Sequence, residues 1–134
     1  MPGSRSGDER VNVFDVGERY CFKHYFDGEA VFAELEPYYN DQAYRFEVPP
    51  DEFEDLREFL RGHGYELRVV DDPDDFAVAV EQYSAHPENV FEESVLQRST
   101  GGYNCFLMTS QMAVAGACGE GAVRIGEVPV ESPF

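Results

Sequence analysis

The order of two hydrophobic periods between Tyr44 and Met108 constrains the fold of this chain more than any other feature. Residues with the composition of short strands occupy 44–48, 65–70, 76–82 and 103–108. Apolar residues at helical spacing occupy 51–61 and 87–98, with acidic residues early in each segment and arginine late. The order strand, helix, strand, strand, helix, strand therefore predicts an α+β fold.

This order is the split βαβ pattern of ferredoxin-like domains. We therefore predict a ferredoxin-like βαββαβ core over about 44–108, with an antiparallel sheet and helices on one face. The helix over 51–61 is the clearest element, because Phe53, Leu56 and Leu60 share one face and Gly62 follows its end. Residues 110–117 form a short apolar run, whose period does not distinguish a helix from an extended segment.

An N-terminal β-hairpin is predicted to extend this sheet. The alternating run at 20–26 ends at Asp27-Gly28, the dipeptide that most strongly favours a tight hairpin turn. We expect residues 30–36 to pair back as a strand. A helix over 29–36 is the alternative, because alanine and acidic residues are good helix formers.

Length and composition indicate one domain over residues 11–126. The 134 residues, 43% of them hydrophobic, are enough for a core that needs no disulfides. Residues 1–10 are polar and are expected to form a disordered tail, and residues 127–134 a C-terminal tail. The odd number of cysteines, Cys21, Cys105 and Cys118, is not a secreted disulfide framework and favours a cytoplasmic location.

The charge balance predicts the environment of the protein. Asp and Glu number 27 against 10 basic residues, of which Lys23 alone is lysine, and the formal net charge is -17. Such a chain repels itself unless salt screens it, and at about 1 M salt the Debye length falls to roughly 3 Å. The composition is typical of cytoplasmic proteins of salt-accumulating halophiles. A mesophilic acidic protein that binds a basic partner is the alternative.

One polar segment stands out as a binding site. Gly101, Gly102, Tyr103 and Asn104 combine a flexible backbone, a stacking ring and a paired donor and acceptor next to a buried strand. Together with Tyr38 and Tyr39 of the expected loop over 37–42, they form the predicted ligand-binding residues. The competing interpretation of the two glycines is a helix C-cap.

A catalytic alternative uses Cys105 as a nucleophile with His86 as its base. It requires the histidine to lie within hydrogen-bond reach of the thiol, which the sequence does not show. A buried structural cysteine is the competing interpretation, because free cysteine behaves as a small hydrophobe in protein cores.

Other chemistries lack their motifs. No Cys-x-x-Cys pair, EF-hand loop, P-loop or dinucleotide fingerprint occurs, so we expect neither a metal nor a cofactor. Aromatic residues crowd the first sixty positions without a basic stripe, which makes nucleic acid an unlikely partner. No apolar run is long enough to span a membrane.

The sequence therefore predicts a halophile-adapted cytoplasmic domain that binds a small molecule or a protein partner in a regulatory or assembly role, without evident catalysis. The alternative is a small thiol-dependent enzyme built on Cys105. A third possibility is a homo-oligomer formed by pairing of exposed sheet edges.

Overall fold

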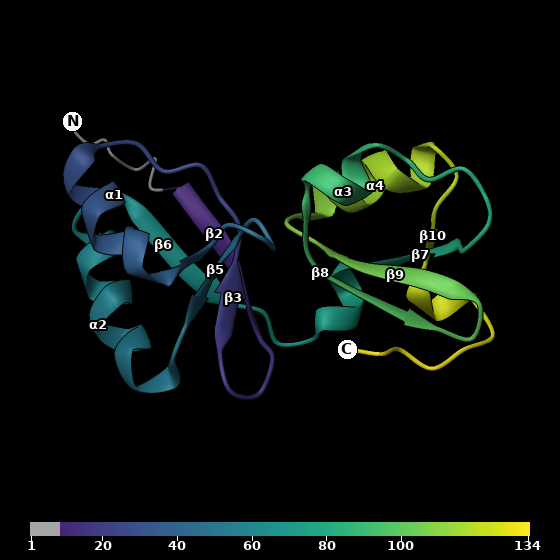
Figure 1. The fold of residues 1–134 in the computed structure, drawn as a ribbon, viewed down its shortest axis with the longest axis horizontal. Coiled ribbons are helices and arrows are strands. Elements are labelled where there is room, and N and C mark those ends of the chain that lie inside the picture. Colours follow the sequence, from purple (N-terminus) through teal and green to yellow (C-terminus); the bar gives the residue numbers. More distant parts are fainter. Residues whose placement is uncertain (1–8) are drawn as a thin grey trace. The chain divides into compact units, whose positions relative to one another are not determined.

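Two compact units, divided between Val70 and Asp71, make up the computed structural model, which describes residues 9–134 (Figure 1). The first unit holds a five-stranded sheet and the second a four-stranded sheet, and helices accompany both. The chain is therefore an α+β protein, as predicted. The single domain expected over 11–126 stays a prediction, and the expected N-terminal tail lies largely outside the described residues.

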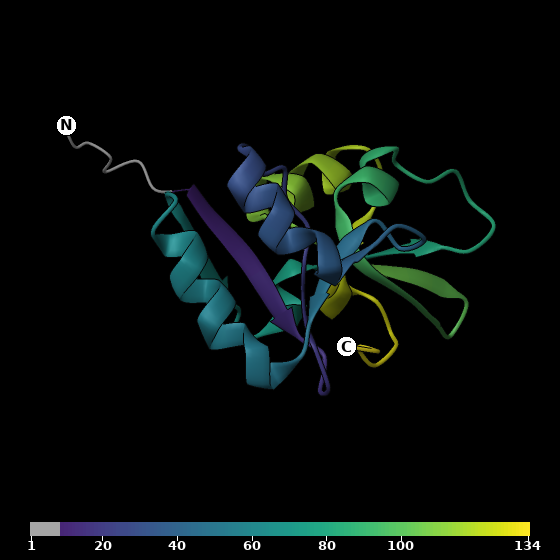
Figure 2. The same ribbon diagram turned by 60° about the vertical axis from the view of Figure 1, so that its left-hand side comes forward.

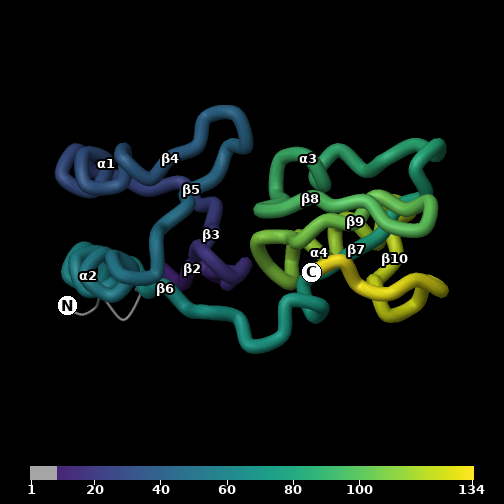
Figure 3. The backbone as a smooth tube through the Cα atoms, turned by 60° about the horizontal axis from the view of Figure 1, so that its bottom comes forward, coloured from purple at the N-terminus to yellow at the C-terminus, as the bar shows by residue number. Residues whose placement is uncertain are grey.

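The first unit runs β2 (Glu9–Asp15), β3 (Tyr20–Phe22), α1 (Glu29–Leu35), η1 (Glu36–Tyr38), β4 (Tyr39–Asn40), β5 (Arg45–Val48), α2 (Pro50–Arg61) and β6 (Tyr65–Val69). Its strands lie in the order β4-β5-β3-β2-β6, and all neighbours are antiparallel except β2 and β6. Both helices cover the same face of the sheet (Figure 3). Their buried residues, among them Val31, Leu35, Phe53, Leu56 and Leu60, form one core with the strands.

The strand expected over 30–36 is a helix, α1, so that prediction was wrong and its alternative is correct. Gly28 does not lie in a hairpin turn but precedes the helix, with φ of 103°. Val31 and Leu35 are buried while Phe32 is 60% exposed, which is the four-residue spacing of a helix face. A different N-terminal hairpin is present. It joins β2 to β3 around Gly17.

The strands at 65–70 and 76–82, which are consecutive in the predicted βαββαβ order and were expected to pair as a hairpin, do not pair with each other. β6 pairs in parallel with β2, from Glu9 opposite Tyr65 to Val13 opposite Val69. α2 provides the crossover that parallel placement of β6 requires. The next residues form η2 (Pro73–Phe76), which Asp72 caps by accepting a hydrogen bond from the Asp74 amide at 3.1 Å. The predicted sheet over 44–108 is thus divided between two sheets, and a ferredoxin-like core at those bounds is not confirmed.

The second unit continues with β7 (Ala77–Glu81), α3 (Asn89–Glu92), β8 (Ser94–Thr100), β9 (Tyr103–Met108), α4 (Gln111–Gly119), β10 (Val123–Arg124) and η3 (Ile125–Glu127). Its strands lie in the order β10-β7-β9-β8, and every neighbouring pair is antiparallel. α3 and α4 lie on one face of this sheet, and the final coil passes along the other face (Figure 1).

The helix expected over 87–98 is mostly a strand. Only Asn89–Glu92 is helical, and β8 then pairs along the whole length of β9. The acidic residues and Pro87 that suggested a helix act only locally, whereas the pairing with β9 satisfies a whole row of backbone groups. The predicted order of strands and helices therefore occurs over residues 77–124, where it consists of β7, α3, β8, β9, α4 and β10.

The undecided segment at 110–117 belongs to α4. Ser110 is its N-cap, and the Ser110 hydroxyl accepts a hydrogen bond from the Ala113 amide at 3.1 Å. Ala113, Val114 and Ala117 are buried beneath the helix. Of the helices within residues 9–134, none combines the length and the apolar composition that crossing a bilayer requires.

Candidate functional site

The two glycines of the predicted site form the turn of the β8–β9 hairpin and not a helix C-cap. Gly101 and Gly102 have φ of 53° and 87°, and a type I′ hairpin turn requires positive φ at both central residues. The loop after β7 emerges at the same end of the sheet (Figure 2). Glu81 pairs with Tyr103, and the Gln82 amide donates to the Gly102 carbonyl at 3.0 Å. The turn and this loop therefore form one surface.

A directed chain of hydrogen bonds joins the hairpin to the loop after β7. The Ser99 hydroxyl donates to Asn104 Oδ1 at 2.7 Å, and Asn104 Nδ2 lies 3.1 Å from His86 Nε2. His86 Nδ1 lies 2.8 Å from the Ser84 carbonyl oxygen, which can only accept. The hydrogen of the neutral ring is therefore on Nδ1, and Nε2 accepts from Asn104. Asn104, one of the predicted site residues, thus holds the loop in place.

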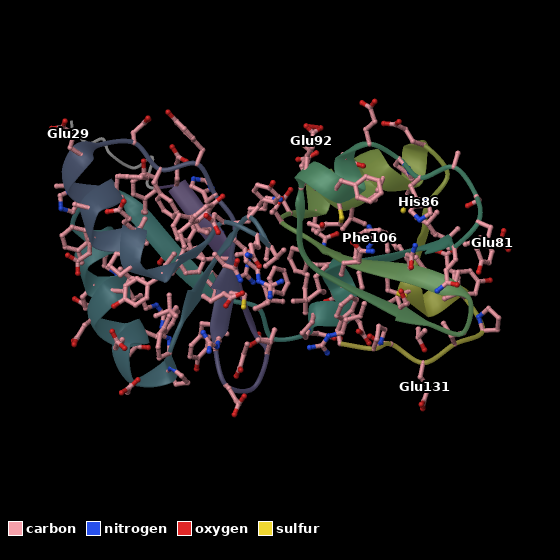
Figure 4. The ribbon with its side chains drawn as sticks, in the orientation of Figure 1. Glu29, Glu81, His86, Glu92, Phe106 and Glu131 are labelled. Atoms are coloured by element: carbon pink, nitrogen blue, oxygen red, sulfur yellow. The ribbon has the colours of Figure 1, made fainter. Side chains whose placement is uncertain are left out.

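Aromatic rings fix the histidine from two sides. The Phe91 ring stacks on His86 at 5.9 Å between centroids, and Phe106 meets it edge-on at 6.1 Å. His86 and Phe106 lie on the face of the sheet that α3 and α4 cover (Figure 4). With both ring nitrogens hydrogen-bonded and both rings in contact, His86 positions the loop.

Two open depressions lie beside Tyr103. The first has a volume of about 450 Å³, and its lining includes Glu81, Tyr83, Ser84, Gly101, Gly102 and Tyr103. The second has a volume of about 460 Å³, and its lining includes Glu81, Ser84, Tyr103, Val123, Glu127 and Pro129. We call them the turn hollow and the tail hollow. Three of the four residues predicted at 101–104 therefore line a concave surface.

The charged side chains that line the hollows are all acidic. Glu81 borders both hollows and Glu127 borders the tail hollow, and neither lining contains a lysine or an arginine. Glu81 points outward at the end of the sheet (Figure 4). Tyr83 is 101% exposed and so presents its whole ring to solvent. The hollows thus combine negative charge with aromatic surface.

The final coil, which includes the predicted C-terminal tail, packs against the hairpin. Arg98 donates to the Pro133 carbonyl at 2.8 Å and lies 6.0 Å from the centre of the Phe134 ring. The Ser132 hydroxyl bonds to the Asp74 carboxylate. A Cβ atom added at Gly101 would lie only 2.5 Å from Val130 Cγ1. The coil therefore contacts the same turn that forms the turn hollow.

The structure does not bring Cys105 and His86 together. Side chains alternate along β9, so Asn104 and Phe106 face the helices and Cys105 faces the opposite side. Cys105 is 0% exposed, and burial raises the pKa of its thiol. The thiol is thus in its unreactive protonated form at neutral pH, and His86 is already bonded to Asn104 and Ser84.

Tyr38 and Tyr39 belong to the first unit, whereas residues 101–104 belong to the second. The Tyr38 hydroxyl donates to Glu52 Oε1 at 2.8 Å. This hydrogen bond, burial and the charges of Glu52, Glu34 and Asp55 raise the pKa of Tyr38 to about 12. Tyr39 is 44% exposed, and its ring meets Phe46 edge-on at 5.0 Å. Tyr38 is therefore engaged within its own unit, and Tyr39 presents part of its ring to solvent.

A charged cluster in the first unit was not predicted from the sequence. Glu47 accepts hydrogen bonds from Arg45 Nε at 2.7 Å and Asn40 Nδ2 at 3.2 Å, and lies 3.6 Å from Arg19 Nη1. Burial acts to raise the pKa of Glu47, but the two hydrogen bonds and the two arginine charges outweigh it and lower the pKa. The alternation of Arg45 and Glu47 on one strand was the available signal.

Glu81, Tyr83 and Ser84 were not predicted either, because only the pairing of β7 with β9 brings them to the glycine turn.

Within residues 9–134, no three histidine, cysteine, aspartate or glutamate side chains gather in a way that could hold a metal ion. No model of a known protein family, no curated protein and no solved structure matches the chain.

Proposed function

We propose that the chain is a binding module of a halophile's cytoplasm, which docks a protein partner on the open end of its second sheet and has no catalytic role. The second unit would then be a ferredoxin-like scaffold over residues 77–124 that presents this surface. The turn and tail hollows, which meet at Tyr103, carry the proposal.

The shape of the surface favours a protein over a small molecule. Sites for small ligands enclose most of the ligand surface, whereas both hollows are open and Tyr83 stands free beside them. An exposed tyrosine ring is a common anchor in protein interfaces, because it supplies large contact area at a low cost in side-chain entropy. The bonded chain from Ser99 to Ser84 holds the loop that carries this ring.

The salt-adapted, cytoplasmic part of the proposal is supported by composition. The net charge is -17 with one lysine, and none of the three cysteines forms a disulfide bond in the structure. Multimolar salt would screen the repulsion among the carboxylates. A partner can then approach the acidic surface without a long-range electrostatic barrier.

The test is the mass of the intact complex, measured by light scattering and native mass spectrometry after purification from a halophilic host in multimolar KCl. We expect mass beyond one chain, and we expect Tyr83→Ser to remove it. Tyr25→Ser is the matched control, because Tyr25 is 83% exposed but belongs to the first unit. Equal retention of the partner by both variants would refute the proposed surface.

Self-association is a separate outcome of the same measurement. β8 is one of the two edge strands of the second sheet, and an edge strand can pair with a strand of another chain. A complex of exactly two chains that survives Tyr83→Ser would identify the protein as a structural homo-oligomer and not as a module for a different partner.

A further inference from the structure

The lining of the two hollows is suited to one kind of chemical group. Glu81 borders both, Glu127 borders the tail hollow, and no basic side chain lines either one. The rings of Tyr83 and Tyr103 add aromatic faces. Resting on the proposed function, we infer that the hollows bind arginine side chains of the partner protein.

The hydrogen-bonding state of Ser84 supports a ligand that only donates. The Ser84 hydroxyl donates its one hydrogen to the Glu81 carbonyl at 2.9 Å, so toward a ligand in either hollow it can only accept. The Glu81 and Glu127 carboxylates, when ionised, are acceptors only. A guanidinium group has five N–H donors and no acceptor, which makes it complementary to these carboxylates and to the Ser84 hydroxyl. Gln82 also lines the turn hollow, and its side-chain amide can accept through its oxygen as well as donate.

Screening by salt favours arginine over lysine. At about 1 M salt the Debye length is roughly 3 Å, so a point charge such as an ammonium group gains little beyond direct contact. A guanidinium group is planar and weakly hydrated, pairs with a carboxylate through two parallel hydrogen bonds, and stacks on aromatic rings. These short-range contacts persist when long-range attraction is screened.

The arrangement of the hollows favours a chain segment over free arginine. Both hollows share Glu81, Ser84 and Tyr103 and are therefore adjacent, so two arginine side chains of one segment can occupy them together. Tyr83 at the rim of the turn hollow is fully exposed and is available to cover a bound side chain. Free arginine would fill one hollow and leave this ring unused.

The test uses the full chain in multimolar KCl and a blocked peptide, acetyl-Gly-Arg-Gly-Arg-Gly-amide, followed by amide chemical shifts. We expect shifts at Ser84, Gly101 and Gly102. The same peptide with citrulline, which keeps the shape but loses the charge, should bind at least about tenfold more weakly, because hydrogen bonds to charged groups are the stronger ones. A third peptide, with lysine in place of both arginines, compares an ammonium with a guanidinium group. Equal affinity for the citrulline or the lysine peptide would overturn the assignment to arginine.

Variants locate the interaction. Glu81→Gln should weaken the arginine peptide by about tenfold, and Tyr103→Leu, which keeps apolar bulk without a ring, should also weaken it. Glu92→Gln is the matched control, because it removes the same charge from an exposed residue of α3 that points away from the hollows (Figure 4). If Glu81→Gln does not fold, Glu127→Gln carries the test in the tail hollow. Equal loss in the glutamate variant and its control would overturn the inference.

The two proposals fail in different ways. If the arginine peptide does not bind but Tyr83→Ser still releases the native partner, the ligand group is wrong and the binding surface stands. If the peptide binds with shifts confined to residues outside the hollows, the site is wrong. If Tyr83→Ser leaves the mass of the native complex unchanged, the proposed function fails as well.

Discussion

Replacing Gly101 by alanine tests whether the final coil packs on the β8–β9 turn as the structure shows. Gly101 has φ of 53°, and an added Cβ would lie 2.5 Å from Val130 Cγ1. Gly102 has φ of 87° with nothing within 4 Å of an added Cβ. Both alanine variants therefore suffer backbone strain, but only Gly101→Ala also collides with the coil. Comparing the two variants separates the strain from the collision.

The expected costs follow from these distances. Left-handed φ costs a residue with a Cβ about 1–2 kcal/mol, and alanine recovers about 0.4–1 kcal/mol by restricting the unfolded chain, so Gly102→Ala should cost about 1 kcal/mol. Val130 has a stiff, β-branched side chain and is half-buried. Displacing it forfeits about 1 kcal/mol more of apolar burial, so Gly101→Ala should cost about 2 kcal/mol.

A double-mutant cycle with Val130→Ala isolates the collision. Without Cγ1 the nearest atom to the new Cβ is the Cβ of residue 130 at 3.5 Å, an ordinary contact. Urea unfolding in multimolar KCl should then show that Gly101→Ala costs only about 1 kcal/mol in the Val130→Ala background, a coupling of about 1 kcal/mol. A coupling near zero would show that the coil does not pack on this turn.

Three further outcomes are expected. Ser110→Ala removes the N-cap of α4 and should lower the free energy of unfolding by about 1 kcal/mol, whereas Ser110→Asn, which keeps a side-chain acceptor at the cap, should change it much less; equal effects would contradict the cap. Because the pKa of Glu47 is lowered on folding, its charge stabilises the protein above the unfolded pKa of about 4.3, and this stabilisation disappears as pH falls through the lower folded pKa. The unfolding free energies of wild type and Glu47→Gln should therefore converge in acid, and a gap that is constant with pH would refute the argument. Site-resolved mass spectrometry after alkylation at neutral pH should find half-buried Cys118 modified before Cys105, and rapid modification of Cys105 in the folded protein would revive the thiol enzyme.

The candidate site was only partly visible in the sequence. Gly101, Gly102 and Tyr103 were found because adjacent glycines beside an aromatic residue indicate an unusual backbone and a binding face. Glu81 and Ser84 carried no such signal, since their role depends on the register that places Glu81 opposite Tyr103. His86 was selected as a possible base for Cys105, whereas the structure places its Nε2 against Asn104 Nδ2.

Local patterns in the sequence determined the elements whose periodicity and neighbours agree. Five elements lie close to their predicted bounds: α2, β5, β6, β7 and β9. Each of them is defined by one apolar face or one short apolar run of its own residues, independently of its tertiary contacts. The acidic composition is likewise a property of the sequence alone, and the prediction that salt screens its charge rests on that composition.

Tertiary structure decided the elements for which local signals conflict. Residues 94–100 carry helix-compatible residues but form a strand, because pairing with β9 satisfies their backbone groups. The choice between β7 and β2 as the neighbour of β6 depends on where α2 returns the chain, and no local period encodes that position. Strand partners are set by contacts between distant residues, so the division into two sheets and the meeting of the two hollows at Tyr103 emerge only when the chain is folded.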